Sequence, residues 1–408
     1  MRIGTDGQFH LTYCSNIHPG EHWPEVFANL KTYIPPLKSR FAPKNPFGIG
    51  LRLANPASQE LLEGDALPRF KAWLDQNDLY VFTLNGFPYG GFHRQVVKEE
   101  VYAPDWMTTE RQTYTVRLAR ILAALLPEEL DGGISSVPVS YKPWFKKKAE
   151  QERDSCLEQS SIQLARTVQA LMELQNESEK WIHLDLEPEP DGMLENSTDV
   201  IKFFQEWLLP KGGAHLAKTL GITATQAQEH ILRHIGVCYD TCHFAVSYEK
   251  PHEVLDRFKQ AGIRIGKIQI SAALKLKLPA SAQARQSALE RLEPFAESTY
   301  LHQVVEKRSD GTFHTYSDLI DALPHLSKTP GQEWRIHFHV PIFVEDYHTV
   351  QSTQEDIKTV LKLLEANPVC PHLEIETYTW EVLPAEMKKD LSASIEREYE
   401  WVLSHLSG

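Results

Sequence analysis

The chain has 408 residues, of which 42% are hydrophobic and 24% charged, so a large packed core is available and a disordered protein is excluded. Lys and Arg number 42 against 55 Asp and Glu, and the net charge of −13 argues against a protein that binds a nucleic-acid backbone. The five cysteines are widely spread, which fits a reducing compartment better than a disulfide framework. With neither a signal peptide nor an apolar run long enough for a membrane span, we expect a cytoplasmic globular protein.

Short β-rich apolar runs recur along the chain, and amphipathic helical patterns separate them. In chain order, the predicted strands are 10–14, 48–53, 80–84, 134–139, 181–186, 235–239, 266–270, 335–339 and 373–376. The predicted helices are 23–33, 110–126, 153–175, 200–209, 251–260, 353–365 and 386–406. Strands that alternate with helices indicate βαβ units and a parallel sheet.

Nine strands are one more than a (β/α)8 barrel requires, and the excess falls in the long stretch between Gln269 and Glu376. There we expect a helix at 281–295 and a hairpin formed by 300–305 and 312–316, and we assign strand 335–339 to the same excursion. We therefore predict an α/β fold, a (β/α)8 TIM barrel in a single domain, 1–408, with an insertion at about 275–332 between strands seven and eight. An open doubly wound sheet is the alternative, but no Gly-x-Gly-x-x-Gly follows any predicted strand.

One predicted strand carries an unusual polar stripe. A barrel strand is buried on both faces and should be almost continuously apolar, yet the fifth strand has the sequence W-I-H-L-D-L-E. Its His183, Asp185 and Glu187 share one face. Burying ionisable groups without partners costs on the order of several kcal/mol each. We therefore expect all three to face a solvated barrel mouth, with Glu187 at the strand end.

Polar side chains also close three later strands. Asp240 ends G-V-C-Y-D, with His243 one turn beyond; Gln269 lies in G-K-I-Q-I-S; and Glu376 ends L-E-I-E. Together with Glu187 they form an oxygen-rich set at the barrel mouth. Such donors suit Mg²⁺ or Mn²⁺ better than a structural zinc.

These motifs carry a family resemblance. The order Glu, Asp-x-x-His, Ile-Gln-Ile and Glu, over about half of the chain, resembles the xylose isomerase-like TIM-barrel superfamily, which includes sugar isomerases and epimerases, hydroxypyruvate isomerase and endonuclease IV. C-Y-D-T-C-H is similar to the endonuclease IV segment, and K-I-Q-I-S to the hydroxypyruvate isomerase branch, where a glutamine binds the metal. The segments 16–23, 85–93, 134–142 and 183–192 resemble the EboE-like "metabolite traffic" family of bacterial ebo gene clusters.

The resemblance implies a metal site and a reaction. The implied ligands are Glu187, Asp240, Gln269 and Glu376, holding Mg²⁺ or Mn²⁺, with Zn²⁺ as the alternative. Glu187 and Glu376 would also be catalytic, one abstracting a proton α to a carbonyl and the other returning it through an enediolate. The implied protein is an isomerase or epimerase acting on a small polyhydroxylated carbonyl metabolite in an ebo-type secondary pathway.

Four further residues are expected to contact substrate. His243 lies beside the implied ligands, and His339, in H-F-H-V-P, occupies roughly the place of an additional endonuclease IV ligand. Tyr89 and His93 belong to a Gly/Pro-rich loop after the third strand, and loops at that barrel face usually shape the pocket. The alternative for the loop is an aromatic segment packed over the barrel.

Two other functions stay open. A metal-dependent phosphodiesterase or hydrolase of the endonuclease IV type is one, although Gln269 and Ser271 replace the His and Asp of that pattern and no full set of extra histidines is obvious. A non-catalytic metabolite-binding protein, alone or in complex with pathway proteins, is the other. The expected partner is a small-molecule metabolite, without nucleic acid or membrane insertion.

Overall fold

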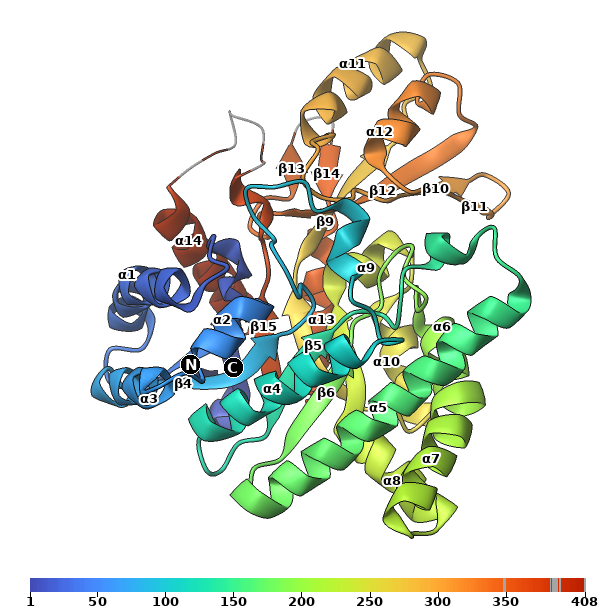
Figure 1. Cartoon of the computed structure of the whole chain (residues 1–408). Helices are drawn as coiled ribbons and strands as arrows, with labels where there is room; N and C mark the ends of the chain where they lie inside the picture. The colour runs from blue at the N-terminus through green and yellow to red at the C-terminus, as the bar shows by residue number, and fades with distance from the viewer. Residues whose placement is uncertain (348–349, 382, 384–387, 389, 407–408) are drawn as a thin grey trace.

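Eight parallel strands form the wall of an α/β barrel (Figure 1). This computed structural model describes residues 1–408 except 348–349, 382, 384–387, 389 and 407–408. The barrel strands are β2 (Phe9–Tyr13), β3 (Phe47–Arg52), β4 (Leu79–Asn85), β5 (Gly132–Ser136), β6 (Ile182–Leu186), β7 (Ile235–Asp240), β8 (Ile265–Ile270) and β15 (His372–Ile375). They are ordered β2-β15-β8-β7-β6-β5-β4-β3, and the short β1 (Arg2–Ile3) pairs antiparallel with β2. The predicted TIM-barrel fold is confirmed.

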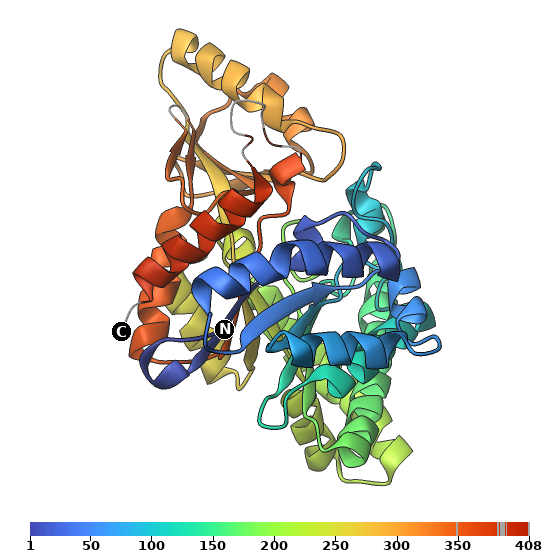
Figure 2. The same cartoon turned by 90° about the vertical axis from the view of Figure 1, so that its left-hand side faces the viewer.

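Helices surround the barrel wall (Figures 1 and 2). They are α1 (Trp23–Phe41), α2 (Asn55–Glu60), α3 (Ala66–Gln76), α4 (Thr109–Leu125), α5 (Glu150–Ser178), α6 (Ser197–Lys202), α7 (Gly213–Leu220), α8 (Ala224–His234), α9 (Thr241–Val246), α10 (Pro251–Gln260), α13 (Gln354–Ala366) and α14 (Leu391–His405). A π-helix, Phe203–Gly212, joins α6 to α7. Short 3-10 turns occur at Thr5–Gly7, Ser15–Ile17, Lys98–Tyr102, Lys142–Phe145, Glu293–Phe295, Leu323–His325 and Thr379–Glu381. None of the helices in the described residues is long and apolar enough to cross a membrane.

The seam between β2 and β3 closes the barrel largely through side-chain hydroxyls. Only one backbone bridge, Cys14 to Gly50, joins the two strands among the described residues. The Thr12 hydroxyl accepts from the Gly50 N–H at 2.8 Å and donates to the Gly48 carbonyl at 3.0 Å. Ser15 Oγ accepts from the Arg52 N–H at 2.8 Å. These hydroxyls take the place of missing ladder bonds, so buried backbone groups at the seam keep partners.

A second, antiparallel sheet follows β8 and stands beyond the C-terminal end of the barrel strands (Figure 1). Its strands are β9 (Ala272–Lys277), β10 (Val304–Arg308), β11 (Phe313–Tyr316), β12 (Gly331–Val340), β13 (Asp346–Tyr347) and β14 (Val350–Ser352). They are ordered β11-β10-β12-β9-β14-β13, and α11 (Ala282–Leu292) and α12 (Leu319–Ala322) belong to the same excursion.

The nine predicted strands are all present, and 335–339 lies within β12 of the second sheet, as assigned. The expected insertion boundaries of 275–332 are too narrow. Only Ser271 separates β8 from β9, and the second sheet continues to Ser352 because β14 pairs with β9. The predicted helix 386–406 begins outside the described residues, and its described part is α14.

Candidate metal centre at the barrel mouth

Three predicted carboxylates meet at the C-terminal end of the barrel. Glu187 directly follows β6, Asp240 is the last residue of β7, and Glu376 directly follows β15. One carboxylate oxygen from each lies within 4.8 Å of the other two. All three side chains are buried. The parallel strands thus carry residues that are far apart in the sequence to one point, which is the usual place of a TIM-barrel active site.

The carboxylates keep oxygens available for a ligand. Asp240 Oδ1 accepts from Ser271 Oγ at 2.6 Å and from the N–H groups of Cys242 and His243 at 2.8 and 3.0 Å. In contrast, Asp240 Oδ2 and Glu187 Oε2 have no hydrogen-bond partner among the described residues. Buried oxygens without partners are costly. Their convergence fits a bound cation.

Two asparagines orient Glu376, and the sequence analysis did not select either as a site residue. The side-chain amides of Asn16 and Asn85 each donate to Glu376 Oε1 at 2.8 Å. Asn85 is the last residue of β4, so the rule that selected Asp240 would have found it too. Asn16 lies in a 3-10 turn after β2, where no strand-end pattern marks it.

The electrostatics of this cluster also favour a cation. Burial raises the pKa of Glu187 and of Glu376 well above the ordinary carboxyl range, and the charges of neighbouring carboxylates, Asp240 among them, raise both further. Lys267 lowers both pKa values, but its ammonium already pairs with Glu374 at 2.6 Å. A divalent ion between the three carboxylates would offset their mutual repulsion and favour their ionised forms. The residues present therefore fit such an ion.

Gln269 lies beside this cluster but does not turn its oxygen toward it. Its Cα is the partner of Asp240 across β7 and β8. The amide Oε1 accepts from Cys238 Sγ at 2.9 Å, and Nε2 has no hydrogen-bond partner in the described part of the chain. A half-turn of the amide plane would exchange the two atoms. The role of Gln269 as a fourth ligand stays a prediction that requires this rotation.

Three histidines lie next to the carboxylates. The Nδ1 atoms of His243, His337 and His339 are hydrogen-bonded to Pro188 O, Gln303 Oε1 and Glu376 O, at 3.1, 2.7 and 2.8 Å. If Nδ1 carries the proton in each ring, the Nε2 lone pairs remain free for a metal. The Nε2 atoms of His243 and His339 are 3.4 Å apart. Burial lowers the pKa of all three imidazoles, so they are neutral at pH 7.

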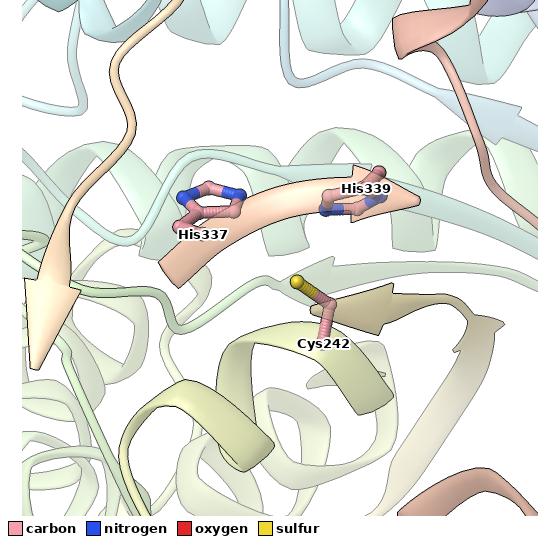
Figure 3. Close-up of side chains that lie close together, drawn as sticks. All are labelled: Cys242, His337 and His339. Atoms are coloured by element: carbon pink, nitrogen blue, oxygen red, sulfur yellow. The ribbon is translucent and has the colours of Figure 1, made fainter. Parts of the chain in front are cut away.

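This histidine cluster was not foreseen in full. Candidate ligand atoms lie within 4.8 Å of one another in three overlapping sets: Asp240, His243 and His339; Glu189, His243 and His337; Cys242, His337 and His339. Figure 3 shows His337 and His339 side by side on β12, with the Cys242 sulfur of α9 directed toward them. β12 therefore brings two histidines from the second sheet to His243 at the mouth, a grouping that was not obvious from the sequence.

A small cavity opens over the site. Its polar lining includes Asn16, Asn85, Glu187, Glu189, His243, His337 and Glu376, and its aromatic lining is Phe87, Phe92, Tyr102, Tyr300 and Tyr378. A mostly apolar pocket with a few convergent polar groups is typical of a small-molecule site.

The predicted substrate contacts divide into two groups. His243 lines the cavity, whereas His339, Tyr89 and His93 are not among its lining residues. Tyr89 packs edge-on against Tyr114, with ring centroids 5.0 Å apart. The His93 ring is hydrogen-bonded through Nε2 to the backbone oxygen of Asn16, so it supports a residue that orients Glu376. Direct substrate contact by these three residues stays a prediction.

The polar stripe of β6 does not lie wholly at the mouth. Glu187 does, but His183 and Asp185 are fully buried and pair with each other; His183, the second residue of β6, also contacts Asp131, the residue before β5. The expectation that all three side chains face the mouth is wrong. Alternate residues of a strand point to the same side, but each step of two residues moves about 6.6 Å along the strand. Side chains on one face therefore need not all lie at the strand end.

No protein-family model matches this chain, and no curated protein matches it. A D-tagatose 3-epimerase-like protein is similar in structure, with 10% identity and a TM-score of 0.39 over 64% of this chain and 75% of that chain. The IOLI protein, solved with a zinc atom, has 10% identity and a TM-score of 0.44 over 97% and 98%. A xylose isomerase-like TIM-barrel protein from Mycobacterium smegmatis, in complex with magnesium, has 12% identity and a TM-score of 0.42 over 97% and 99%. The fold described above rests on the strand order of the chain itself.

Proposed function

We propose that the protein is a divalent-metal-dependent isomerase or epimerase that acts on a small polyhydroxylated carbonyl compound. The observation that carries the proposal is the meeting of Glu187, Asp240 and Glu376 beneath a cavity with aromatic walls. As the EboE-like resemblance implies, the substrate would be a metabolite of a secondary pathway.

In this proposal Glu187, Asp240 and Glu376 hold the metal, and Gln269 joins them after its amide rotates. The bound ion would stabilise negative charge on the substrate oxygens. One of the two glutamates, as the carboxylate, would accept a proton from a substrate carbon, and the other, as the carboxylic acid, would donate a proton from the opposite face, so that the two groups exchange protonation states in the step. Asn16 and Asn85 both donate to one oxygen of Glu376 and so orient its carboxyl group.

Isotope exchange tests the two glutamates. The Mn²⁺-loaded protein is incubated in D2O with D-tagatose, hydroxypyruvate and a panel of other small ketoses, and NMR follows deuterium entry at the carbon next to the carbonyl. We expect Glu187→Gln and Glu376→Gln each to lose exchange by at least about 100-fold. Glu398→Gln, at a buried glutamate outside the cavity lining, is the matched control and should retain exchange.

The variants also separate the proposal from its rivals. Exchange that persists in both glutamine variants would refute the assigned roles. Tight binding of a ligand without any exchange in the wild type would instead support a non-catalytic metabolite-binding protein.

The cluster of His243, His337 and His339 favours a second candidate, a zinc-dependent phosphodiesterase or other hydrolase. Neutral imidazoles beside a shared carboxylate suit Zn²⁺, and two neighbouring ions can activate water and stabilise a leaving oxygen. Hydrolysis of bis(4-nitrophenyl) phosphate by the zinc-loaded protein, lost in His339→Gln, would support this candidate. Deuterium exchange into a ketose without hydrolysis of the phosphodiester would support the isomerase.

A further inference from the structure

A second group of possible ligands lies at the opposite, N-terminal end of the barrel. Asp131 directly precedes β5, His183 is on β6, and His372 is the first residue of β15. One ligand atom from each lies within 4.8 Å of the others. In the sheet order, β8 and β7 separate β15 from β6, so the group joins wall segments that are not neighbours.

The distances within this group suit a shared metal ion. The Nε2 atoms of His183 and His372 lie 3.4 and 3.3 Å from the two oxygens of Asp131. Neither nitrogen has a partner other than Asp131 within the described residues, and both rings are buried. Ligands about 2.1 Å from a zinc ion at tetrahedral angles lie about 3.4 Å from one another. Each of the two nitrogen–oxygen distances is therefore one that two ligands of a zinc ion would have.

A neighbouring carboxylate fixes the orientation of one imidazole. His183 Nδ1 is 2.9 Å from Asp185 Oδ1, and Asp185 is fully buried. With the proton on Nδ1, the lone pair of Nε2 faces the Asp131 carboxylate, so two acceptors oppose each other. A cation between them removes this conflict. A carboxylate behind a metal-binding imidazole is a common arrangement in zinc sites.

Three glycines make space for this group inside the barrel wall. A Cβ on Gly133 of β5 would lie 2.7 Å from His183 Cε1. A Cβ on Gly236 of β7 or Gly266 of β8 would lie 2.7 or 1.9 Å from Asp185 Oδ1. None of the three has a positive φ, so glycine is required there by space and not by backbone conformation.

The charge and the access of the group also suit a divalent ion. Asp131 and Asp185 are acidic, and Arg264, whose Nη1 is 3.6 Å from Asp131 Oδ2, supplies one positive charge. With neutral histidines a single negative charge remains. The Asp131 side chain is 20% exposed, so an ion can reach the group from solvent at this end of the barrel.

We propose that Asp131, His183 and His372 form a second metal site, which binds Zn²⁺ with water as a fourth ligand, and that Asp185 orients His183 within it. Two imidazoles and one carboxylate are donors that zinc accepts in proteins. The ion would clamp the N-terminal end of the barrel by linking the segment before β5 to β6 and β15. The inference does not depend on the reaction at the mouth.

Zinc stoichiometry tests the site. The full-length protein is stripped with a chelator, loaded with Zn²⁺ and passed through a desalting column, and the bound zinc is counted by elemental analysis. We expect Asp131→Asn and His372→Gln each to bind one zinc ion fewer than the wild type. Asp185→Asn should keep the site but bind this ion about 10–100-fold more weakly in calorimetric titration.

A matched control and a folding check make the result decisive. His234 is another buried histidine, on α8, with Nδ1 hydrogen-bonded to Ile182 O, and His234→Gln should bind as much zinc as the wild type. Because Asp131 is partly exposed, Asp131→Asn should fold even if His372→Gln does not. A folded Asp131→Asn variant with the full zinc content of the wild type would overturn the proposal. Zinc that is lost in Glu376→Gln belongs to the mouth site, so this variant distinguishes the mouth site from the site at Asp131.

Discussion

At the residue scale, Glu376 uses its two carboxylate oxygens differently. Oε1 accepts from the amides of both Asn16 and Asn85, while Oε2 lies 3.8 Å from His339 Nδ1. Two donors on one oxygen fix the carboxylate plane before any ligand arrives. Such fixed groups need little reorganisation when charge develops in a reaction.

Substitution of Gln269 tests the fourth ligand. Because its side chain lies at a strand end beside Asp240 and, among the described residues, is hydrogen-bonded only to Cys238 Sγ, Gln269→Ala should leave the fold intact. We expect Mn²⁺ affinity to fall by at least about tenfold, as for the loss of a metal-contacting group. Isothermal titration with Mn²⁺ measures this change. Gln163→Ala, at a buried glutamine on α5, is the control, and wild-type affinity in Gln269→Ala would exclude the ligand role.

Metal removal should make stability depend on pH. In the metal-free protein the pKa values of Glu187 and Glu376 are raised. The folded state then holds protons that the unfolded state releases above about pH 4.5, so stability falls as pH rises from there toward the raised values. Thermal melts between pH 5 and 8 should show this decline with a chelator and a smaller one with Mn²⁺. Equal slopes in both conditions would contradict a metal between these carboxylates.

At the element scale, Glu398 fastens α14 to two distant segments. Its Oε1 accepts from Thr377 Oγ1 at 2.7 Å and from the Ile342 N–H at 3.3 Å. The residues concerned follow β15 and β12, so one carboxyl group links a peripheral helix to both sheets. Burial raises the pKa of Glu398 to about 8.

The variant Glu398→Gln isolates this contribution. In the wild type, folding favours the protonated acid, so the stability that it supplies is complete below about pH 4.5 and is lost as pH rises to about 8. Between pH 5 and 8, the free energy of unfolding of the wild type should therefore fall relative to Glu398→Gln, by up to about 1.4 kcal/mol per pH unit. Urea titrations of both proteins across this range measure the difference. A constant difference would mean that the carboxyl group stays ionised.

Elements that depend on local pattern could be predicted from the sequence, and those that depend on distant packing could not. The helix at 251–260 matches α10 because Pro251 begins it and Val254 and Phe258 follow at helical spacing. The helix at 23–33 ends too early, because α1 continues through Pro35 and Pro36 to Phe41. No helix was predicted for α3 or for α8, although Thr223 forms a capping box with Gln226 at the start of α8.

The candidate metal centre could likewise be predicted from the sequence only in part. Glu187, Asp240 and Glu376 could be found because each follows or ends a strand, and parallel strands bring their ends together. His337 joins them only because β12 pairs with β9 and β10 in the second sheet. The paired strands are far apart in the sequence, so no periodic pattern near His337 reveals the pairing.

At the scale of the whole molecule, β12 connects the second sheet to the barrel mouth. Trp334 is fully buried near its start and donates from Nε1 to Glu306 Oε2 at 2.8 Å, while His337 and His339 follow on the same strand. The packing of the second sheet therefore determines where two histidines of the mouth lie.

Trp334→Ala should destabilise the molecule as one unit. Loss of a large buried aromatic side chain costs about 3–5 kcal/mol. If 1–408 is a single cooperative domain, calorimetry of Trp334→Ala should show one unfolding transition at a lower temperature than in the wild type. The metal affinity of the mouth site should also fall in this variant. Ile320→Ala, at a side chain 61% exposed on α12, is the control and should change stability by about 0.5 kcal/mol or less. Two separate transitions would indicate two domains.

We expect the seam between β2 and β3 to admit water more easily than the other strand pairs of this barrel. The amides of Gly50 and Arg52 each depend on one hydroxyl that can rotate, those of Thr12 and Ser15. Hydrogen exchange at such amides needs only a side-chain rotation, whereas strand pairs elsewhere must separate several backbone bonds together. Native-state breathing should therefore begin at this seam, whose strands lead into the Asn16 turn. Water would then reach the surroundings of Glu376 slowly through the barrel wall at this seam, as well as through the open mouth.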